Sequence, residues 1–291
     1  MTRVTADRDM IKSPFAHMLQ KSPRLYRITR KVYSLFALRA RFVPLSANSL
    51  PDGILAQLRN DPGYHGIIDD LVAYTGFSAK ELTPYLLRRP EKHFQSEFEW
   101  FSPKNERELT WFYRAGSAYL FGNAVHPYAP ALDIIGEGTV LDFGAGAGCN
   151  TIGLAKRGIH VDFLEINSLQ ADFIRFRVER HNLKNVRGIA PYHDGKFDPI
   201  SCITERYDAI AAMDVLEHIP DYRRFVAHFI ERLNPGGLII ENSPFDPNAG
   251  QIAIHLRAPI PLEEAMAGME RMKRGVWRKP PISQAERGSP Y

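Results

Sequence analysis

The sequence predicts an α/β fold in which a parallel sheet carries helices on both faces, preceded by a helical segment. From Gly138 onward, short apolar strands alternate with amphipathic helices, which is the pattern of repeated βα units. The predicted strands are apolar almost throughout, as strands covered on both faces are. The 44% hydrophobic and 24% charged shares match folded soluble domains, and no apolar run reaches the ~18 residues that span a bilayer.

The elements of the predicted sheet follow one another in a regular order. Strands are expected at residues 139–143, 160–166, 185–190, 207–214 and 238–242. Helices are expected at residues 149–158, 168–183 and 222–233, each with apolar residues at helical spacing. The run Asn234-Pro-Gly-Gly237 predicts a turn between the last helix and the fifth strand.

Four segments are expected along the chain. They are a basic N-terminal helical arm with a linker (1–52), a helical substrate subdomain (53–137), a cofactor-binding core (138–250) and a C-terminal extension with a basic tail (251–291). In the second segment, Ser78 and Glu81 have the spacing of a helix capping box. Its aromatic residues, Tyr113 and Tyr119 among them, either fill the core of this subdomain or form a lid over a substrate pocket.

The charges of the chain are unevenly distributed. Residues 1–47 hold ten Lys and Arg against two acidic residues, whereas residues 48–250 hold twenty against twenty-seven. An acidic middle argues against nucleic acid as a partner. The basic stretch 22–42 has three possible interpretations: a helix packed on the domain, a helix lying on an anionic membrane surface, or a targeting segment. With only two cysteines the chain suits a reducing compartment, so we expect a cytoplasmic protein, with membrane contact through residues 22–42 left open.

A glycine-rich loop follows the first predicted strand. Glycines let the backbone of Gly144–Gly148 turn sharply and approach a ligand closely, and the next helix begins there with its N–H groups exposed. A dinucleotide fingerprint would place its third glycine at Cys149. Asp142 would repel phosphates and attract an ammonium group, and Glu165 can accept both hydroxyls of a ribose. The loop therefore favours a nucleoside that carries an amino acid.

With these residues in place, the chain resembles the class I S-adenosylmethionine-dependent methyltransferases, in their small-molecule branch. The resemblance covers about residues 138–245 and rests on four pieces in order: the loop 142–148, Glu165, the run 214–220 and the turn 233–237. It implies a Rossmann-like methyltransferase sheet and S-adenosylmethionine as cofactor.

The resemblance also implies a set of cofactor-binding residues. Asp142 and the loop would hold the methionine part, and Glu165 would bind the ribose. Asp194 would contact the adenine amino group. The full expected set is Asp142, Gly144, Ala145, Gly146, Gly148, Glu165, Ile166, Asp194, Met213 and Asp214.

The family further implies methyl transfer by in-line displacement onto a small-molecule acceptor, driven mainly by proximity. A base is needed only if the acceptor must lose a proton, and His218 is the candidate by residue type. Tyr113, Tyr119 and His255 are candidate substrate contacts, and no metal is expected. Two alternatives remain: an RNA methyltransferase that uses the basic arms, and a non-catalytic protein with a degenerate methyltransferase fold.

Methyltransferases of this class usually end with a helix and an antiparallel strand pair. Only 46 residues follow Phe245, and the run 261–275 has the composition of a helix. We therefore expect no full strand pair, so that the sheet edge is short or completed by another chain. The sequence leaves the oligomeric state open.

Overall fold

The computed structural model describes residues 58–87, 113–114, 118–243, 245 and 261–281. The chain divides into two compact units, Met1–Ser49 and Leu50–Tyr291, and every element below belongs to the second. The predicted basic helix 22–42 and the candidate substrate residue His255 lie outside the described residues.

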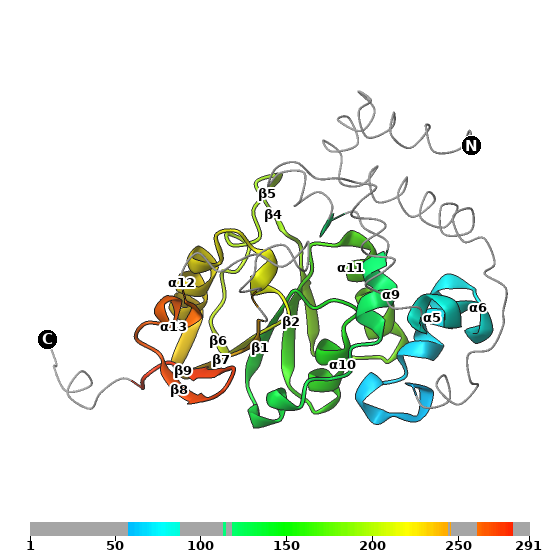
Figure 1. The fold of residues 1–291 in the computed structure, drawn as a ribbon, viewed down its shortest axis with the longest axis horizontal. Coiled ribbons are helices and arrows are strands. Elements are labelled where there is room, and N and C mark those ends of the chain that lie inside the picture. Colours follow the sequence, from blue (N-terminus) through cyan, green and yellow to red (C-terminus); the bar gives the residue numbers. More distant parts are fainter. Residues whose placement is uncertain (1–57, 88–112, 115–117, 244, 246–260, 282–291) are drawn as a thin grey trace, which may run out of the picture. The chain divides into compact units, whose positions relative to one another are not determined.

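A seven-stranded sheet forms the centre of the second unit, in the order β3-β2-β1-β6-β7-β9-β8 (Figure 1). Its strands are β1 (Thr139–Phe143), β2 (His160–Leu164), β3 (Val186–Ile189), β6 (Tyr207–Met213), β7 (Leu233–Asn242), β8 (Glu270–Lys273) and β9 (Val276–Arg278). The first five are parallel to one another. The chain moves outward from β1 to β3, then returns to the other side of β1 with β6, so the strand order reverses between β1 and β6. The predicted Rossmann-like sheet is confirmed.

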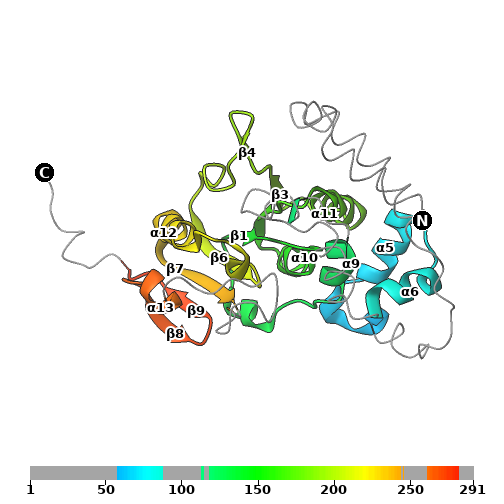
Figure 2. The same cartoon turned by 45° about the horizontal axis from the view of Figure 1, so that its top comes forward.

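Helices cover both faces of this sheet, as predicted. α10 (Cys149–Lys156) and α11 (Ser168–Arg180) lie on one side of β1 and β6, and α12 (Tyr222–Arg232) lies on the other (Figure 2). The alternation of side chains in β1 explains this division. Val140 packs with Leu154 of α10, whereas Phe143 packs with Phe229 of α12 at a ring-centre distance of 5.0 Å.

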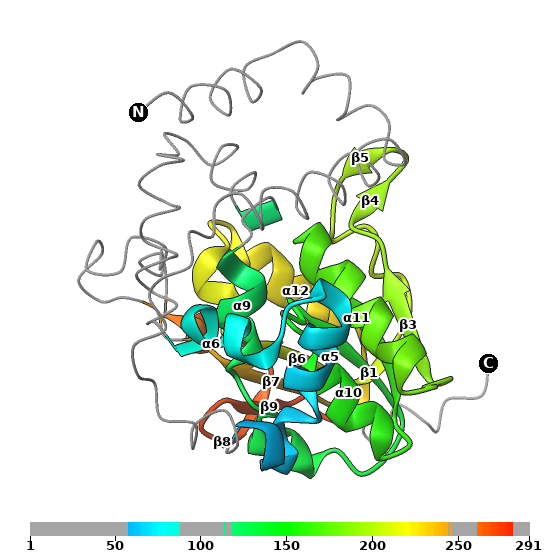
Figure 3. The ribbon, with the colours of Figure 1, turned by 90° about the vertical axis from the view of Figure 1, so that its right-hand side faces the viewer.

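The N-terminal part of the second unit is helical in its described residues, as predicted. It contains the 3-10 turns η1 (Pro62–Tyr64) and η2 (Pro130–Ile134) and the helices α5 (Ile67–Thr75), α6 (Ala79–Leu87) and α9 (Ala118–Ala124). α5 and α9 both contact α11 (Figure 3). The capping box is confirmed, because Ser78 N donates to Glu81 Oε2 at 2.8 Å and Glu81 N donates to Ser78 Oγ at 3.3 Å. The segment boundaries at 53, 138 and 251 stay predictions.

The C-terminal extension differs from its prediction. Within its described residues, 261–281, only α13 (Leu262–Ala265) is helical, and β8 and β9 then form an antiparallel hairpin that pairs with β7. Gly268, in the turn between α13 and β8, and Gly275, in the turn of the hairpin, adopt φ values of +85° and +71°. The buried side chain of Trp277 lies opposite Ile239. The expectation of a helix through 261–275 and of an incomplete sheet edge is therefore wrong.

Two smaller differences concern the strands. The predicted turn 234–237 lies inside β7, where the register with β6 shifts between Tyr207 and Ala209. The chain also forms a short hairpin, β4 (Tyr192–His193) and β5 (Lys196–Phe197), which the sequence analysis did not predict. Among the described residues, no helix is long and apolar enough to cross a membrane.

Candidate functional site

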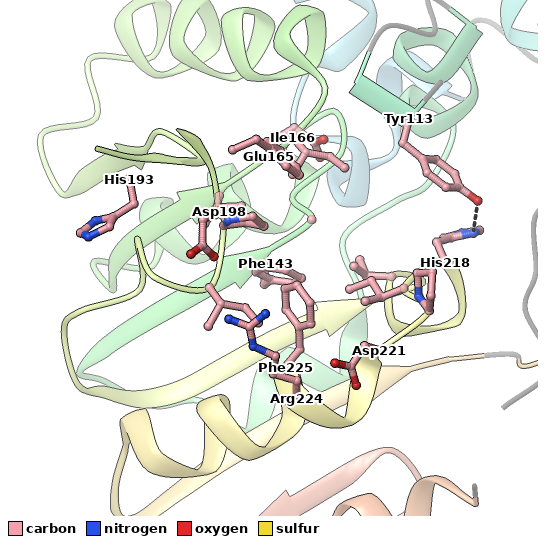
Figure 4. Close-up of a pocket in the computed structure, with 18 of the residues that line it drawn as sticks. Tyr113, Phe143, Glu165, Ile166, His193, Asp198, His218, Asp221, Arg224 and Phe225 are labelled. Carbon is pink, nitrogen blue, oxygen red and sulfur yellow. Dashed lines mark hydrogen bonds between the residues drawn. The ribbon is translucent and has the colours of Figure 1, made fainter. Parts of the chain in front are cut away.

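A cavity of about 730 Å³ opens where the parallel strands end, beside the point at which the strand order reverses (Figure 4). Its walls come from the loops after β1, β2 and β6, from the β4–β5 hairpin and from the start of α12. Open parallel sheets bind their ligands at this position because the loops on either side of the reversal diverge. The cavity is therefore the candidate active site.

The glycine-rich loop passes directly beneath this cavity. Gly144, Gly146 and Gly148 all have left-handed backbone conformations, with φ of +71°, +58° and +80°. A Cβ atom on Gly144 would lie 2.4 Å from Cγ2 of Val215, which lines the cavity from the end of β6. The loop is thus packed against the neighbouring strand end so closely that no side chain fits at Gly144.

Glu165 follows β2 and lines the cavity beside the loop. Its Oε2 accepts a hydrogen bond from Gly146 N at 2.8 Å, and its Oε1 accepts one from Asn167 N at 2.7 Å. Burial raises the pKa of Glu165 to about 7. A carboxylate offers about four acceptor positions, so these two bonds leave room for the hydroxyl groups of a ligand.

Asp142 lies near the end of β1, just before the glycine-rich loop. Its side chain is 1% exposed and does not line the cavity. Its Oδ2 accepts a hydrogen bond from Thr151 Oγ1 at 2.5 Å, and burial raises its pKa to about 6. Asp142 therefore ties the end of β1 to the first turn of α10. Its expected contact with an ammonium group stays a prediction.

The other predicted cofactor contacts divide into two groups. Gly144, Glu165, Ile166, Asp194 and Asp214 line the cavity. Ala145, Gly146, Gly148 and Met213 are not among the residues that line it.

Asp214 and Asp194 both stand at sharp turns of the backbone. Their φ values are +53° and +48°, a conformation that is uncommon outside glycine and is tolerated best by Asp and Asn. Asn242 Nδ2 donates to Asp214 Oδ1 at 3.1 Å, which holds this turn against the end of β7. The side chain of Asp194 is 88% exposed at the tip of the β4–β5 hairpin.

Tyr113 and His218 meet at one end of the cavity, although 105 residues separate them in the sequence. The hydroxyl of Tyr113 lies 3.3 Å from Nδ1 of His218, within hydrogen-bond distance (Figure 4). Burial, and then the charge of Glu217, raise the pKa of Tyr113, so its hydroxyl keeps its proton at neutral pH. Tyr119 belongs to α9, but its side chain lies outside the described part of the structure.

Glu217 lies behind this pair and is fully buried. Its Oε1 is 3.8 Å from Nε2 of His218, and within the described ranges neither carboxyl oxygen has a hydrogen-bond partner in another residue. Burial raises the pKa of Glu217 to about 8, and the nearby Asp214 and Glu241 act in the same direction. The group is therefore mostly neutral at pH 7.

Replacing Glu217 by glutamine is expected to remove a pH dependence of stability. In the unfolded chain a glutamate loses its proton near pH 4.3, whereas folded Glu217 keeps it to about pH 8. Between these values only the folded state binds the proton, so the free energy of unfolding falls as the pH rises. Urea unfolding at pH 5 and pH 8 should show a loss about 2–4 kcal/mol larger for the wild type than for Glu217→Gln. An equal fall in the free energy of unfolding for the wild type and Glu217→Gln would contradict this expectation. Glu205→Gln, at an exposed position, is the control and should behave as the wild type does.

Sequence reasoning missed several residues of the cavity wall. Asp198 lines the cavity, and its pKa is lowered chiefly by the hydrogen bond that Ser201 Oγ donates at 2.6 Å. Arg224 and Phe225 enter from α12. The hairpin that carries part of this wall has a recognisable signal, because Asp194-Gly195 is a dipeptide typical of tight hairpin turns.

The same hairpin is joined to the residues beside Tyr113. Arg114 hydrogen-bonds the hydroxyl of Tyr192, and its guanidinium carbon lies 4.4 Å from the centre of the Phe197 ring. Such cation–π contacts link segments that come from distant parts of the sequence.

In the part of the chain that the structure describes, no three His, Cys, Asp or Glu side chains gather as a metal site requires.

Comparisons with known proteins show the family to which the chain belongs. The family model described as "Methyltransferase domain" matches residues 87–262, more than half of the chain. The ubiquinone biosynthesis O-methyltransferase of Paramagnetospirillum magneticum is 30% identical over 103 residues, which cover 35% of this chain and 39% of that protein. The enzyme of the same name from Psychrobacter arcticus is 27% identical over 126 residues, covering 40% and 45%. The chain thus matches less than half the length of these relatives.

Among solved structures, TehB from Haemophilus influenzae is similar with a TM-score of 0.41 and 20% identity. The similarity covers 51% of this chain and 60% of TehB.

Proposed function

This chain belongs to the class I S-adenosylmethionine-dependent methyltransferases, and from that premise we propose that it methylates a hydroxyl group of a small-molecule acceptor. The observation that carries the proposal is the Tyr113–His218 pair at one end of the cavity. An oxygen acceptor must lose a proton when it is methylated, and an imidazole is the side chain whose ordinary pKa lies nearest neutrality. The curated relatives named above are O-methyltransferases by name, which supports an oxygen acceptor.

The residues of the cavity fit the cofactor. The loop leaves no space for a side chain at Gly144, as a backbone that cradles a ligand requires. Glu165 presents a carboxyl group to the cavity with acceptor positions for the two ribose hydroxyls. Ile166 gives an apolar surface for the adenine, and Asp214 places a negative charge on the side where a sulfonium would lie.

The remaining part of the cavity suits an acceptor with an apolar ring. Phe143, Phe225 and Ile219 line it, and the first two belong to the core between the sheet and α12. Aromatic side chains bind flat apolar groups well and restrict their orientation. The acceptor hydroxyl would then point toward Tyr113 and His218.

The proposed mechanism is mostly one of positioning. When bound, S-adenosylmethionine supplies a methyl group that its sulfonium charge has already activated. The cavity wall holds the acceptor oxygen in line and keeps water out, which accounts for much of the rate. The Tyr113–His218 pair takes the hydroxyl proton, which ends on the imidazole, and Glu217 lies 3.8 Å from the ring that becomes positively charged.

The proposal can be tested with the purified chain in two steps. Calorimetric titration with S-adenosylmethionine and with S-adenosylhomocysteine should show binding of both. A panel of phenols, catechols, amines and thiols is then offered with the cofactor, and release of S-adenosylhomocysteine is measured. Turnover of hydroxyl compounds is expected. Turnover confined to amines or thiols would refute an oxygen acceptor, and absence of cofactor binding would refute the site.

Cofactor affinity is expected to rise between pH 6 and pH 8. Ribose hydroxyls donate to an ionised carboxylate, so binding selects the ionised form of Glu165, whose pKa is about 7 in the free protein. Below that pH, part of the binding energy is spent on removing the proton. Glu165→Gln should flatten the pH profile and weaken binding by about 1–3 kcal/mol at pH 8.

Glu217→Gln is the matched control for this experiment. It replaces another buried glutamate with a raised pKa, but one that does not line the cavity. It should keep the pH profile of the wild type. A wild-type affinity that is constant from pH 6 to pH 8 would show that Glu165 does not bind the cofactor in its ionised form.

A further inference from the structure

The back of the glycine-rich loop, on the side away from the cavity, is held by one buried arginine. Arg177 of α11 is 0% exposed. Its Nη1 donates to the carbonyl of Ala147 in the middle of the loop at 2.9 Å, and its Nη2 donates to the carbonyls of Tyr64 and His65 at 3.3 and 3.2 Å. One guanidinium therefore joins the loop to a segment that lies more than eighty residues earlier in the chain.

Asp70 of α5 supplies the opposite charge. It is 1% exposed, and its Oδ2 accepts a hydrogen bond from Arg177 Nε at 2.9 Å. His181 Nε2 lies 2.9 Å from the same oxygen, and Arg180 Nε lies 3.1 Å from Oδ1. A buried charge persists only when it is paired and hydrogen-bonded, so Asp70 fixes the direction in which Arg177 points.

The segment 61–66 also packs against the helix that starts at the loop. His65 adopts a left-handed conformation with φ of +50°, and its ring lies over Gly153 of α10. A Cβ atom on Gly153 would lie 2.5 Å from His65 Nε2 and 2.4 Å from the ring of Tyr128. α10 is therefore held against this segment at a distance that only glycine permits.

We propose that Arg177 and Asp70 are positioning residues for the cofactor, acting through the Ala147 carbonyl and the segment 61–66 on the conformation of the glycine-rich loop. Asp70, Tyr64 and His65 precede residue 87, where the family match begins. They are thus a contribution of this chain's own N-terminal part to the cofactor site. The inference rests on the assignment of S-adenosylmethionine to the cavity.

Arg177→Lys is the most informative variant. Lysine keeps the charge beside Asp70, but a single ammonium cannot reach Ala147, Tyr64 and His65 with the planar fork of a guanidinium. We expect S-adenosylhomocysteine to bind about tenfold more weakly, the order seen when a partner that orients a binding group is lost. In the ligand-free protein, the amides of residues 144–149 should exchange hydrogen faster than in the wild type. Asp70→Asn should act in the same direction.

Arg187→Met is the matched control. Arg187 forms an ion pair with the buried Asp162 between β2 and β3, away from the loop, so its loss tests the general effect of breaking such a pair. It should leave both the affinity and the loop exchange unchanged. A folded Arg177→Lys or Asp70→Asn variant with wild-type affinity and wild-type exchange would overturn the inference. A different result is that the wild type itself fails to bind S-adenosylhomocysteine while the variants still show faster loop exchange. That result would refute the cofactor assignment and not the link between Arg177 and the loop.

Discussion

Gly144→Ala is expected to weaken S-adenosylmethionine binding by about 100-fold or more, the order that an ångström-scale misplacement of a binding group costs. The new Cβ would lie 2.4 Å from Cγ2 and 2.9 Å from Cγ1 of Val215, so either the loop or the end of β6 must move. Both segments contribute residues to the cavity wall, so either movement changes its shape. The alanine must also keep φ near +71°, a conformation that costs an L-residue roughly 1–2 kcal/mol. Calorimetric titration at several temperatures measures the effect directly.

Gly76→Ala is the control that separates the effect of backbone strain from the effect of the clash with Val215. Gly76 has the same φ of +71°, but a Cβ atom there would meet no other atom within 4 Å. It ends α5, away from the cavity, so it carries the backbone strain without the clash. We expect a modest loss of stability and unchanged affinity. If Gly144→Ala binds the cofactor as the wild type does, the close packing of loop against strand end has no part in binding.

The parallel core of the fold was predictable because its signals are local. β1 begins and ends where the apolar run 139–143 does, and α10 begins at Cys149 as the glycine loop predicts. Buried strands need continuous apolar residues, and a left-handed turn needs glycine, so neither depends on what lies far away in the sequence. Glu165 and Asp214 follow from the same reasoning, because both lie at the end of a predicted strand, and both line the cavity.

The parts that were not predicted depend on contacts over long sequence distances. The run 261–275 has good helix-forming residues, yet Val276 and Trp277 gain more by burial against β7 than a helix would. The hydrogen bond that Thr151 Oγ1 donates to Asp142 was not predicted either, since only the packed structure shows these two side chains together. The partnership of Arg177 with residues 64, 65 and 70 leaves no local pattern in the sequence.

Replacing His218 by glutamine is expected to lower kcat for a hydroxyl acceptor by about 10²–10⁴, the usual contribution of a general base. Glutamine keeps similar size and can still hydrogen-bond Tyr113, but it cannot hold the proton that the acceptor loses. The affinity for the cofactor should stay within about twofold, because glycine loop and Glu165 are untouched. Initial rates at saturating cofactor, with a separate calorimetric affinity, distinguish a lost base from a disturbed site.

His193→Gln is the matched control, and Tyr113→Phe tests the partner. His193 also lines the cavity, but its ring is 55% exposed on the β4–β5 hairpin, so its loss should leave kcat nearly unchanged. Tyr113→Phe removes only the hydroxyl 3.3 Å from His218 Nδ1, and it should lower kcat less than His218→Gln does. The two losses should not add, since Tyr113 and His218 act as one hydrogen-bonded unit in the transfer of the proton. Full activity of His218→Gln would mean that the acceptor oxygen reaches the methyl group already ionised, and that proximity alone drives the transfer.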